Sequence, residues 1–328
     1  MYTAHKDRYL TMPYRRCGKS GIKLPAVSLG MWQNFGSTRP YNNSHSMLLK
    51  AFDLGITHFD LANNYGPNRG TAEETLGRTL KSDLMPYRDE LIISTKAGSS
   101  MWEGPYGDFG SRKNILSSLD ASLKRMGIDY VDIFYSHRPD PETPIYETMS
   151  AFADSVKMGK ALYIGLSNYS AEQTKEAVAV LNSLGIYPLI HQMRYSMLCR
   201  EPENELFDTL SDEGMGSIAF CPLSQGLLTN RYLSGIPSDS RVASPDGSLS
   251  ENNIDDKTLQ KIRQLSLIAV DRNQSMAQLA ISWALKNTTS VLIGASRTEQ
   301  IEENVKSLSN LEFSTDQIAQ IDEILNNE

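Results

Sequence analysis

Asp60-Leu-Ala-Asn-Asn-Tyr-Gly66 follows the short β-branched and aromatic run Ile56-Thr-His-Phe59, which itself begins right after Gly55. Such a glycine stops a helix, and the run after it has the composition of a strand. Asp60 is therefore expected at the end of a strand, with Tyr65 on the loop beyond it. A carboxylate and a phenol at one strand mouth indicate acid/base chemistry, although the stretch alone also fits an aspartate that holds a turn and an aromatic ring packed under a loop.

Strand and helix patterns alternate along the rest of the chain. Core strands are expected at 25–29, 56–60, 91–95, 131–135, 162–166, 189–191, 217–220 and 291–293, behind a small N-terminal hairpin over 14–24. Helices are expected at 44–54, from 71, at 114–126, 145–158, 171–184, 206–213, 259–270 and 276–285, and from 298. Ser44 is the expected cap of the first helix, and Thr71 with Glu74 the expected capping box of the second.

Strict alternation of eight strands with helices is typical of an α/β protein with a parallel sheet. The most economical arrangement is a (β/α)8 TIM barrel, here one domain over 1–328 with an N-terminal β-hairpin and extra helices near the C-terminus. An open doubly wound sheet is the alternative. The polar segment from Ser224 to Asn253 is expected to be a mobile lid.

Composition limits the class of protein. The 328 residues are 40% hydrophobic and 22% charged, and a net charge of -7 argues against binding nucleic acid or an acidic membrane surface. No apolar run approaches the ~18 residues of a membrane span, and the start lacks a signal-peptide core, so a cytoplasmic protein is expected. Cys17, Cys199 and Cys221 form no Cys-x-x-Cys or Cys/His cluster and are interpreted as reduced packing thiols.

Titratable residues follow three successive strands: Asp60 the second, Lys96 the third and His137 the fourth. In a barrel these strand ends meet at one mouth, which Tyr65 can also reach. A tyrosine has a pKa of ~10, and an ammonium ~4 Å away would stabilise the phenolate by roughly 4 kcal/mol at an effective dielectric of ~20. Lys96 is therefore expected to lower the pKa of Tyr65, Asp60 to keep Lys96 charged, and His137 to donate a hydrogen bond to a substrate carbonyl.

Two other interpretations stay open at this point. His58 lies two residues before Asp60, and with His137 and His191 it would fit a metal-dependent barrel hydrolase. No resident metal is otherwise expected. The loop aromatics are expected either to line a substrate pocket with Tyr65 and His137 or to pack under the loops; they are Trp32, Phe35, Trp102 and Tyr106.

Longer motifs carry a family resemblance over nearly the full length. They are Gly-Ile-Thr-His-Phe-Asp-Leu-Ala-Asn-Asn-Tyr-Gly (55–66), Ile-Ser-Thr-Lys (93–96), Tyr-Ser-His-Arg-Pro (135–139), Gly-Leu-Ser-Asn (165–168), and Leu-Ile-Gly-Ala-Ser-Arg (292–297) with Gln-Ile-Glu-Glu-Asn (300–304). With these motifs the chain resembles the aldo-keto reductases. The resemblance implies a catalytic tetrad of Asp60, Tyr65, Lys96 and His137, and NADPH bound across the barrel mouth without a Gly-x-Gly-x-x-Gly motif.

The resemblance also implies the cofactor contacts. For the nicotinamide they are Ser167, Asn168 and Gln192 at the carboxamide and Tyr195 stacked on the ring. For the pyrophosphate they are the loop Phe220, Cys221, Pro222, Leu223, Ser224, Gln225 and Gly226, with Arg231 and Arg241. For the adenosine 2′-phosphate and adenine they are Ser296, Arg297, Gln300, Glu303 and Asn304, at a helix start that favours an anion. Trp32, Asp60 and Gly294 complete the set.

Within the family the chain most resembles the bacterial L-glyceraldehyde 3-phosphate reductases and, next, the potassium-channel β-subunits. Residues 89–98 and 130–138 carry the first likeness, and the channel subunits typically have Asn at the position of His137. The resemblance implies NADPH-dependent reduction of small aldehydes and ketones, such as L-glyceraldehyde 3-phosphate and methylglyoxal. A nicotinamide-sensing binding module is the alternative. The expected partner is a small-molecule aldehyde, and a homo-oligomer is left open.

Overall fold

A parallel barrel forms the body of the protein. The computed structural model describes residues 2–237 and 254–326. Within these ranges, eight parallel strands close into a barrel in the order β10-β3-β4-β5-β6-β7-β8-β9, so the predicted TIM barrel is confirmed. The strands are β3 (Val27–Gly30), β4 (His58–Asp60), β5 (Ile92–Ala97), β6 (Val131–Ser136), β7 (Ala161–Ser167), β8 (Ile190–Arg194), β9 (Gly216–Phe220) and β10 (Ser290–Ile293).

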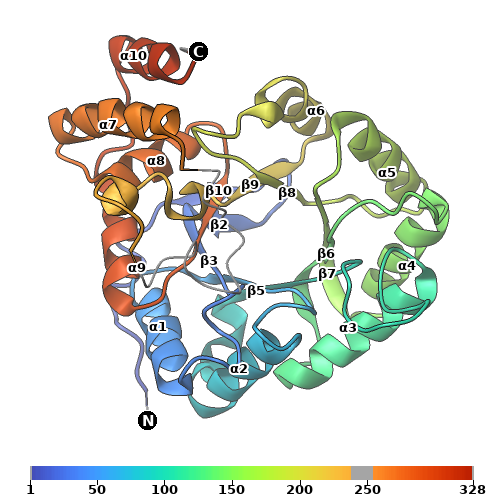
Figure 1. Cartoon of the computed structure of the whole chain (residues 1–328). Coiled ribbons are helices and arrows are strands. Elements are labelled where there is room, and N and C mark those ends of the chain that lie inside the picture. The colour runs from blue at the N-terminus through green and yellow to red at the C-terminus, as the bar shows by residue number, and fades with distance from the viewer. Residues whose placement is uncertain (1, 238–253, 327–328) are drawn as a thin grey trace.

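Helices surround the barrel (Figure 1). They are α1 (Tyr41–Asp53), α2 (Thr71–Thr79), α3 (Arg112–Met126), α4 (Ile145–Lys157), α5 (Ala171–Ser183), α6 (Leu206–Glu213), α7 (Asp256–Asp271), α8 (Met276–Ala284), α9 (Thr298–Val305) and α10 (Thr315–Asn326). Helices α7 and α8 both fall between β9 and β10, and α10 follows the last barrel helix, which confirms the extra helices near the C-terminus. None of the helices in the described residues is long and apolar enough to cross a membrane.

The starts of α1 and α2 differ from the sequence prediction. Helix α1 begins at Tyr41 after Pro40, so Ser44 lies inside the helix, where its hydroxyl donates to the carbonyl of Asn34. Helix α2 is preceded by Gly70 in the left-handed region without a side-chain cap. The Thr71 hydroxyl donates back to Asn68 O at 2.7 Å, so the expected capping box is wrong.

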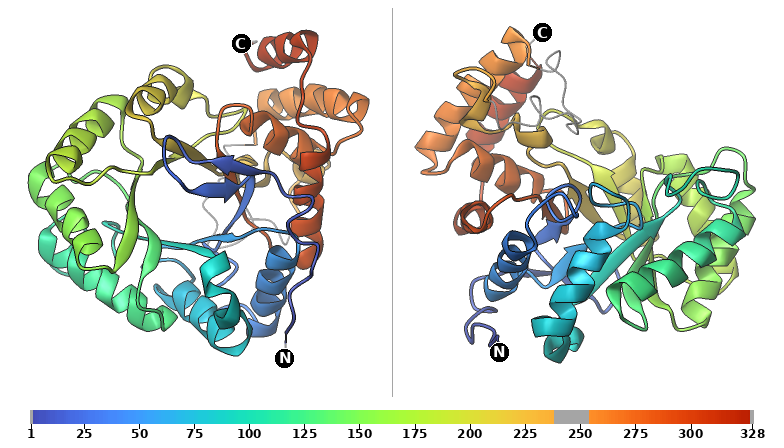
Figure 2. Two further views of the ribbon diagram at one scale, coloured as in Figure 1. Left: turned by 180° about the vertical axis from the view of Figure 1, so that it is seen from behind. Right: turned by 60° about the horizontal axis from the view of Figure 1, so that its bottom comes forward.

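The N-terminal hairpin closes one end of the barrel. Strands β1 (Tyr14–Arg16) and β2 (Lys23–Pro25) pair antiparallel, as predicted. The turn between them reaches the segment before β9, where Lys19 N donates to Gly214 O at 2.8 Å. Figure 2 (left) shows this blue hairpin lying across the barrel. Because β9 starts there, the hairpin covers the N-terminal ends of the strands and leaves the C-terminal ends as the mouth.

Strand register sets which side chains share a level of the barrel. Asp60 pairs with Ser94, and Lys96 pairs with Tyr135, which in turn pairs with Gly165. A Cβ atom on Gly165 would collide with the Tyr135 ring, so the glycine makes room for this large buried side chain inside the barrel. Lys96 lies two residues beyond Ser94 on the same strand, and therefore on the same face.

The segment after β9 is described only in part. It begins with the short helices Ser224–Gly226 and Asn230–Tyr232. Arg241 and the rest of the expected lid between 238 and 253 lie outside the described residues. The lid and the role of Arg241 stay predictions.

Candidate active site

The loop that carries Tyr65 is fixed from both sides. Asp60 is the last residue of β4, and the backbone carbonyl of Tyr65 accepts hydrogen bonds from Gly70 N and Ala72 N at the start of α2. Gly66 has a φ of 92°, and its N–H donates to Trp32 O on the neighbouring loop at 2.8 Å. A side chain there would be strained in this conformation, so glycine permits the turn that presents Tyr65 to the mouth.

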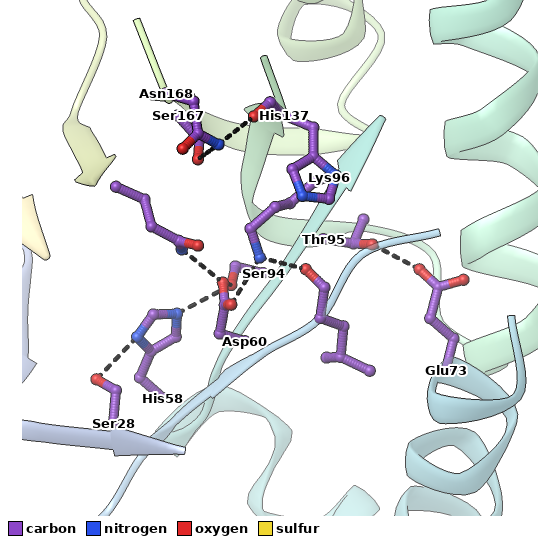
Figure 3. Close-up of polar contacts among 12 residues, drawn as sticks. Ser28, His58, Asp60, Glu73, Ser94, Thr95, Lys96, His137, Ser167 and Asn168 are labelled. Atoms are coloured by element: carbon purple, nitrogen blue, oxygen red, sulfur yellow. Dashed lines mark hydrogen bonds and ion pairs between the residues drawn. The ribbon is translucent and has the colours of Figure 1, made fainter. Parts of the chain in front are cut away.

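Lys96 and Asp60 form a buried ion pair beneath the mouth (Figure 3). The Lys96 Nζ lies 2.6 Å from Asp60 Oδ2, and their side chains are 0% and 2% exposed. Lys96 also donates to Leu61 O at 2.7 Å. The other carboxylate oxygen, Oδ1, accepts hydrogen bonds from Ser94 Oγ at 2.7 Å and Gln192 Nε2 at 3.0 Å. Each oxygen of Asp60 is thus held by at least one donor, as a buried carboxylate requires.

Tyr65 and His137 lie above this pair. Their rings meet edge to face with centroids 5.8 Å apart, and Lys96 Nζ is 4.7 Å from the centroid of the Tyr65 ring. His137 follows β6, and its backbone carbonyl accepts a hydrogen bond from Asn168 Nδ2 at 2.9 Å. The structure therefore brings together the three residues predicted at successive strand ends and Tyr65, which was predicted on the loop after Asp60. Lys96 itself lies within β5, one residue before its end.

The histidine is neutral. Burial, aided by the nearby Lys96 charge, lowers the pKa of His137 to about 3, against the opposing effect of Asp60. Its Nδ1 is buried without a hydrogen-bond partner. A neutral imidazole has one N–H donor and no full charge, so His137 can polarise a ligand oxygen by hydrogen bonding.

The expected lowering of the Tyr65 pKa is not found. Burial raises this pKa well above the usual value of a phenol, and the charges of Asp60 and Cys221 raise it further. The ammonium of Lys96 approaches the ring and is hydrogen-bonded to Asp60 and Leu61. The ammonium therefore offsets only part of the cost of burying a phenolate, and the pKa of Tyr65 stays raised. Tyr65 holds its proton throughout the physiological pH range.

A cavity of about 1090 Å³ opens over these residues. Ligand pockets for drug-sized molecules usually span ~300–1,000 Å³, so a dinucleotide together with a small substrate fits this size. The predicted site residues that line it are Trp32, Asp60, Tyr65, His137, Ser167, Asn168, Gln192, Phe220, Cys221, Pro222, Leu223, Gln225, Gly226, Arg231, Gly294, Ser296, Arg297, Gln300, Glu303 and Asn304. Ser224 is buried beside this wall and its hydroxyl lies 2.8 Å from Ser196 Oγ.

The two ends of the cavity differ in chemistry. Ser167, Asn168 and Gln192 supply hydroxyl and amide groups next to the ion pair. At the other end the N-terminus of α9 brings Arg297 to the wall, and a helix start favours an anion. There the Ser296 backbone N–H and hydroxyl both donate to Gln300 Oε1, at 2.8 and 3.1 Å. Amide groups at one end and anion-binding groups at the other match the donor set that a phosphorylated nicotinamide dinucleotide needs.

Tyr195 does not lie where the resemblance suggested. It is buried, its ring stacks on Trp283 with centroids 5.1 Å apart, and its hydroxyl donates to Glu203 Oε1 at 2.6 Å. Side chains alternate along a strand, so Gln192 and Arg194 of β8 lie on the side of the strand that faces the cavity, and Tyr195 lies on the opposite side. Phe220, which pairs with Arg194, lines the cavity instead.

Three of the expected substrate-pocket aromatics lie elsewhere. Phe35 is buried in the core, so its ring packs under the loop. Trp102 and Tyr106 are 41% and 52% exposed and do not line the cavity, and Lys113 Nζ approaches the Tyr106 ring to 5.1 Å. Only Trp32 of the four loop aromatics lines the cavity.

Several polar lining residues were not predicted from the sequence. They are Gln33, Asn34, Thr38, Arg39, Asn64, Ser99, Arg194, Thr229, Asn230 and Ser275. The period-two alternation of a strand could have identified Arg194, because it lies two residues beyond Gln192. The others lie mainly on loops, whose course the sequence pattern does not specify.

The geometry weighs against a metal centre. Both ring nitrogens of His58 are engaged, Nδ1 with Ser28 Oγ and Nε2 with Ser94 Oγ, each at 3.0 Å. His191 Nε2 lies 3.2 Å from Tyr169 O. In the residues that the structure describes, no group of three or more His, Cys, Asp or Glu side chains could hold a metal ion.

Comparison with known proteins agrees with this geometry. Residues 26–326 match the model of the aldo/keto reductase family. The chain is 56% identical to the L-glyceraldehyde 3-phosphate reductase of Escherichia coli (strain K12), over 98% of this chain and 95% of that protein. It is 39% identical to a probable voltage-gated potassium channel subunit beta of Arabidopsis thaliana, over 90% of this chain and 91% of that protein. It is 37% identical to a probable voltage-gated potassium channel subunit beta of Oryza sativa subsp. japonica, over 94% of this chain and 94% of that protein. This chain belongs to the aldo/keto reductase family and is an oxidoreductase.

Proposed function

We propose that this protein reduces small aldehydes and ketones to alcohols with NADPH. The observation that carries the proposal is the contact of Tyr65 with His137 in the lining of the cavity, above the buried Lys96–Asp60 pair. The identity to L-glyceraldehyde 3-phosphate reductase supports phosphorylated and other small polar aldehydes, including methylglyoxal, as substrates. The cytoplasmic location, the single domain and the oligomeric state stay predictions.

The tetrad residues take distinct roles in this proposal. NADPH supplies the hydride when bound. The Tyr65 hydroxyl donates its proton to the carbonyl oxygen, and its raised pKa keeps that proton in place until the oxygen becomes basic. The neutral His137 donates a hydrogen bond to the same oxygen. Burial lowers the pKa of Lys96, and Asp60 opposes this shift and favours the ammonium, which stabilises the phenolate that Tyr65 becomes.

The remaining cavity residues hold the cofactor. Ser167, Asn168 and Gln192 would bind the carboxamide of the nicotinamide, and the loop from Phe220 to Gly226 with Arg231 would lie along the pyrophosphate. Arg297 and Ser296 would bind the 2′-phosphate, which favours NADPH over NADH. The hydroxyl of Ser296 would exchange its bond to Gln300 for one to phosphate.

The decisive test is NADPH consumption with L-glyceraldehyde 3-phosphate and with methylglyoxal. Tyr65→Phe keeps the ring and removes the proton donor, and kcat is expected to fall by roughly 10²-fold or more. NADPH affinity, measured by quenching of tryptophan fluorescence, is expected to stay near the wild-type value. Tyr187→Phe is the matched control, because Tyr187 is exposed and does not line the cavity. Equal turnover in Tyr65→Phe and Tyr187→Phe contradicts the role given to Tyr65.

The same assay separates the second candidate function. The likeness to potassium channel β-subunits raises a non-catalytic role, and the candidate is a module that binds NADPH as a sensor. Such a protein would bind NADPH tightly with negligible turnover over a panel of aldehydes. A wild-type rate well above the uncatalysed reaction decides for the reductase.

A further inference from the structure

His58 lies directly below the active site but does not line the cavity. Its side chain is fully buried on β4, two residues before Asp60. The ring bridges two hydroxyl groups, Ser28 on β3 through Nδ1 and Ser94 on β5 through Nε2, both at 3.0 Å. Ser94 in turn donates a hydrogen bond to Asp60 Oδ1. Figure 3 shows these groups as one continuous chain that ends at the carboxylate.

The protons in this chain can be assigned by counting donors. Asp60 pairs with the Lys96 ammonium and therefore acts as a carboxylate, which only accepts. The single hydroxyl proton of Ser94 must then point to Asp60 Oδ1, 2.7 Å away. Ser94 Oγ has no second proton to give, so the contact with His58 requires a proton on Nε2. The carboxylate thus fixes the tautomer of a histidine that it does not touch.

The other ring nitrogen is an acceptor. Burial lowers the pKa of His58 to about 4, with Lys96 lowering it and Asp60 raising it, so the ring is neutral near pH 7. Nδ1 then accepts from the Ser28 hydroxyl. Ser28 Oγ lies 2.7 Å from Ser290 Oγ, and because Ser28 gives its proton to Nδ1, the single Ser290 hydroxyl proton serves this contact; Pro25 O, also 2.7 Å from Ser290 Oγ, is its alternative acceptor. The chain is anchored in this way at the closed end of the barrel.

We propose that His58 is a positioning residue for the reduction: its Nε2–H holds Ser94 Oγ, and Ser94 in turn fixes the Asp60 carboxylate against Lys96. This inference rests on the proposed function. Without the Nε2–H donor, Ser94 can rotate and donate elsewhere. Asp60 Oδ1 would then keep only Gln192 as a donor, and the carboxylate would be free to turn. Lys96 would lose the alignment by which it supports the phenolate of Tyr65.

Substitutions that keep or remove the donor test this role. Gln can place an amide N–H near the position of Nε2, whereas Leu fills similar space without a donor. His58→Leu is expected to lower kcat on the order of tenfold with the KM for NADPH within about twofold, and His58→Gln to recover most of the rate. His191→Leu is the matched control, because His191 is also a fully buried histidine of the barrel but contacts Tyr169 O instead of the tetrad. If His58→Leu does not fold, His58→Asn replaces it, since Asn is too short to reach Ser94.

A double-mutant cycle with Ser94→Ala distinguishes positioning from general destabilisation. If His58 acts through Ser94, removing both is no worse for kcat than removing Ser94 alone. Additive losses, or an unchanged rate in His58→Leu while Ser94→Ala is slow, overturn the proposal. A wild-type protein without NADPH turnover contradicts the proposed function instead. The tautomer is then read independently by ¹⁵N NMR of the imidazole at pH 7: a proton on Nε2 supports the hydrogen-bond chain, and a proton on Nδ1 alone overturns it.

Discussion

Lys96→Met gives the sharpest test of the buried ion pair. The substitution keeps most of the apolar stem and removes the ammonium, which lies 2.6 Å from Asp60 Oδ2 at 0% exposure. At an effective dielectric of ~20 the attraction at this distance is about 6 kcal/mol, but both ions have also been taken out of water. Removing one partner of a buried pair typically costs about 3–5 kcal/mol, because the other charge is left uncompensated.

Asp60 retains two hydrogen-bond donors after this change, so the expected loss of unfolding free energy lies in the lower part of that range. Ser94 and Gln192 still donate to Oδ1, so we expect the free energy of unfolding to fall by about 3 kcal/mol. The kcat for aldehyde reduction is expected to fall by roughly 10²-fold or more, since the phenolate of Tyr65 loses its counter-charge. Urea unfolding followed by circular dichroism measures the first quantity, and NADPH oxidation the second.

Arg88→Met is the matched control for loss of stability. Arg88 pairs with Asp132 at 2.8 Å, and both side chains are nearly buried, away from the cavity lining. This variant is expected to lose a comparable free energy of unfolding with kcat unchanged. The double variant Lys96→Met with Asp60→Asn should regain part of the stability, because no lone charge remains, but not the activity. A loss below about 1 kcal/mol in Lys96→Met, or equal rates in Lys96→Met and Arg88→Met, would refute this reasoning.

Two further predictions concern pH and cofactor choice. Burial lowers the pKa of His58 and of His191 to about 4, so between pH 6.5 and 4 the unfolded chain binds protons that the folded protein does not. The free energy of unfolding should therefore fall as the pH falls, by about 1.4 kcal/mol per pH unit for each such histidine. In His58→Gln, the slope of the free energy of unfolding against pH should be smaller by that amount between pH 6 and 5. Equal slopes in the wild type and His58→Gln would show that His58 is already protonated in the folded state. Arg297→Ala should raise the KM for NADPH about tenfold and leave that for NADH within twofold, because only NADPH carries a 2′-phosphate. Equal changes for both cofactors would remove Arg297 from that site.

Elements with a strong period were predicted closely, whereas their caps were not. The structure has α6 at Leu206–Glu213, the predicted range, because apolar spacing and Gly214 mark both of its ends. The first turn of α1 depends on Pro40, which presets its own φ, and on a contact between Ser44 and Asn34 O. Serine is a residue type that often caps helices, and only the structure shows that Ser44 lies inside α1 instead of at its start.

The site residues divide along the same line. Residues at strand ends were found because parallel strands of a barrel present their C-terminal ends at one mouth, whatever the loops do. Tyr195 was wrongly predicted to stack on the nicotinamide because the prediction relied on the family resemblance. Strand alternation instead places Arg194 on the side of β8 that faces the cavity and Tyr195 on the other side. Trp102 and Tyr106 lie on a long loop whose course depends on tertiary contacts, so residue type alone could not place them. Position at the strand ends predicts that the carboxylate, the ammonium and the imidazole lie together, but the sequence does not specify which group accepts each proton.

The hydrogen bonds that hold the Lys96 ammonium near Tyr65 explain how a tyrosine with a raised pKa can still act as an acid. An ammonium has three donors, and two of them are taken by Asp60 and Leu61 O. The charge remains 4.7 Å from the centre of the Tyr65 ring, where it contributes about 3 to 4 kcal/mol to a phenolate at an effective dielectric of ~20. That contribution is smaller than the cost of burying the anion, so the resting phenol stays protonated. It becomes decisive only when the carbonyl oxygen gains negative charge, and this restricts proton transfer to the moment of reduction.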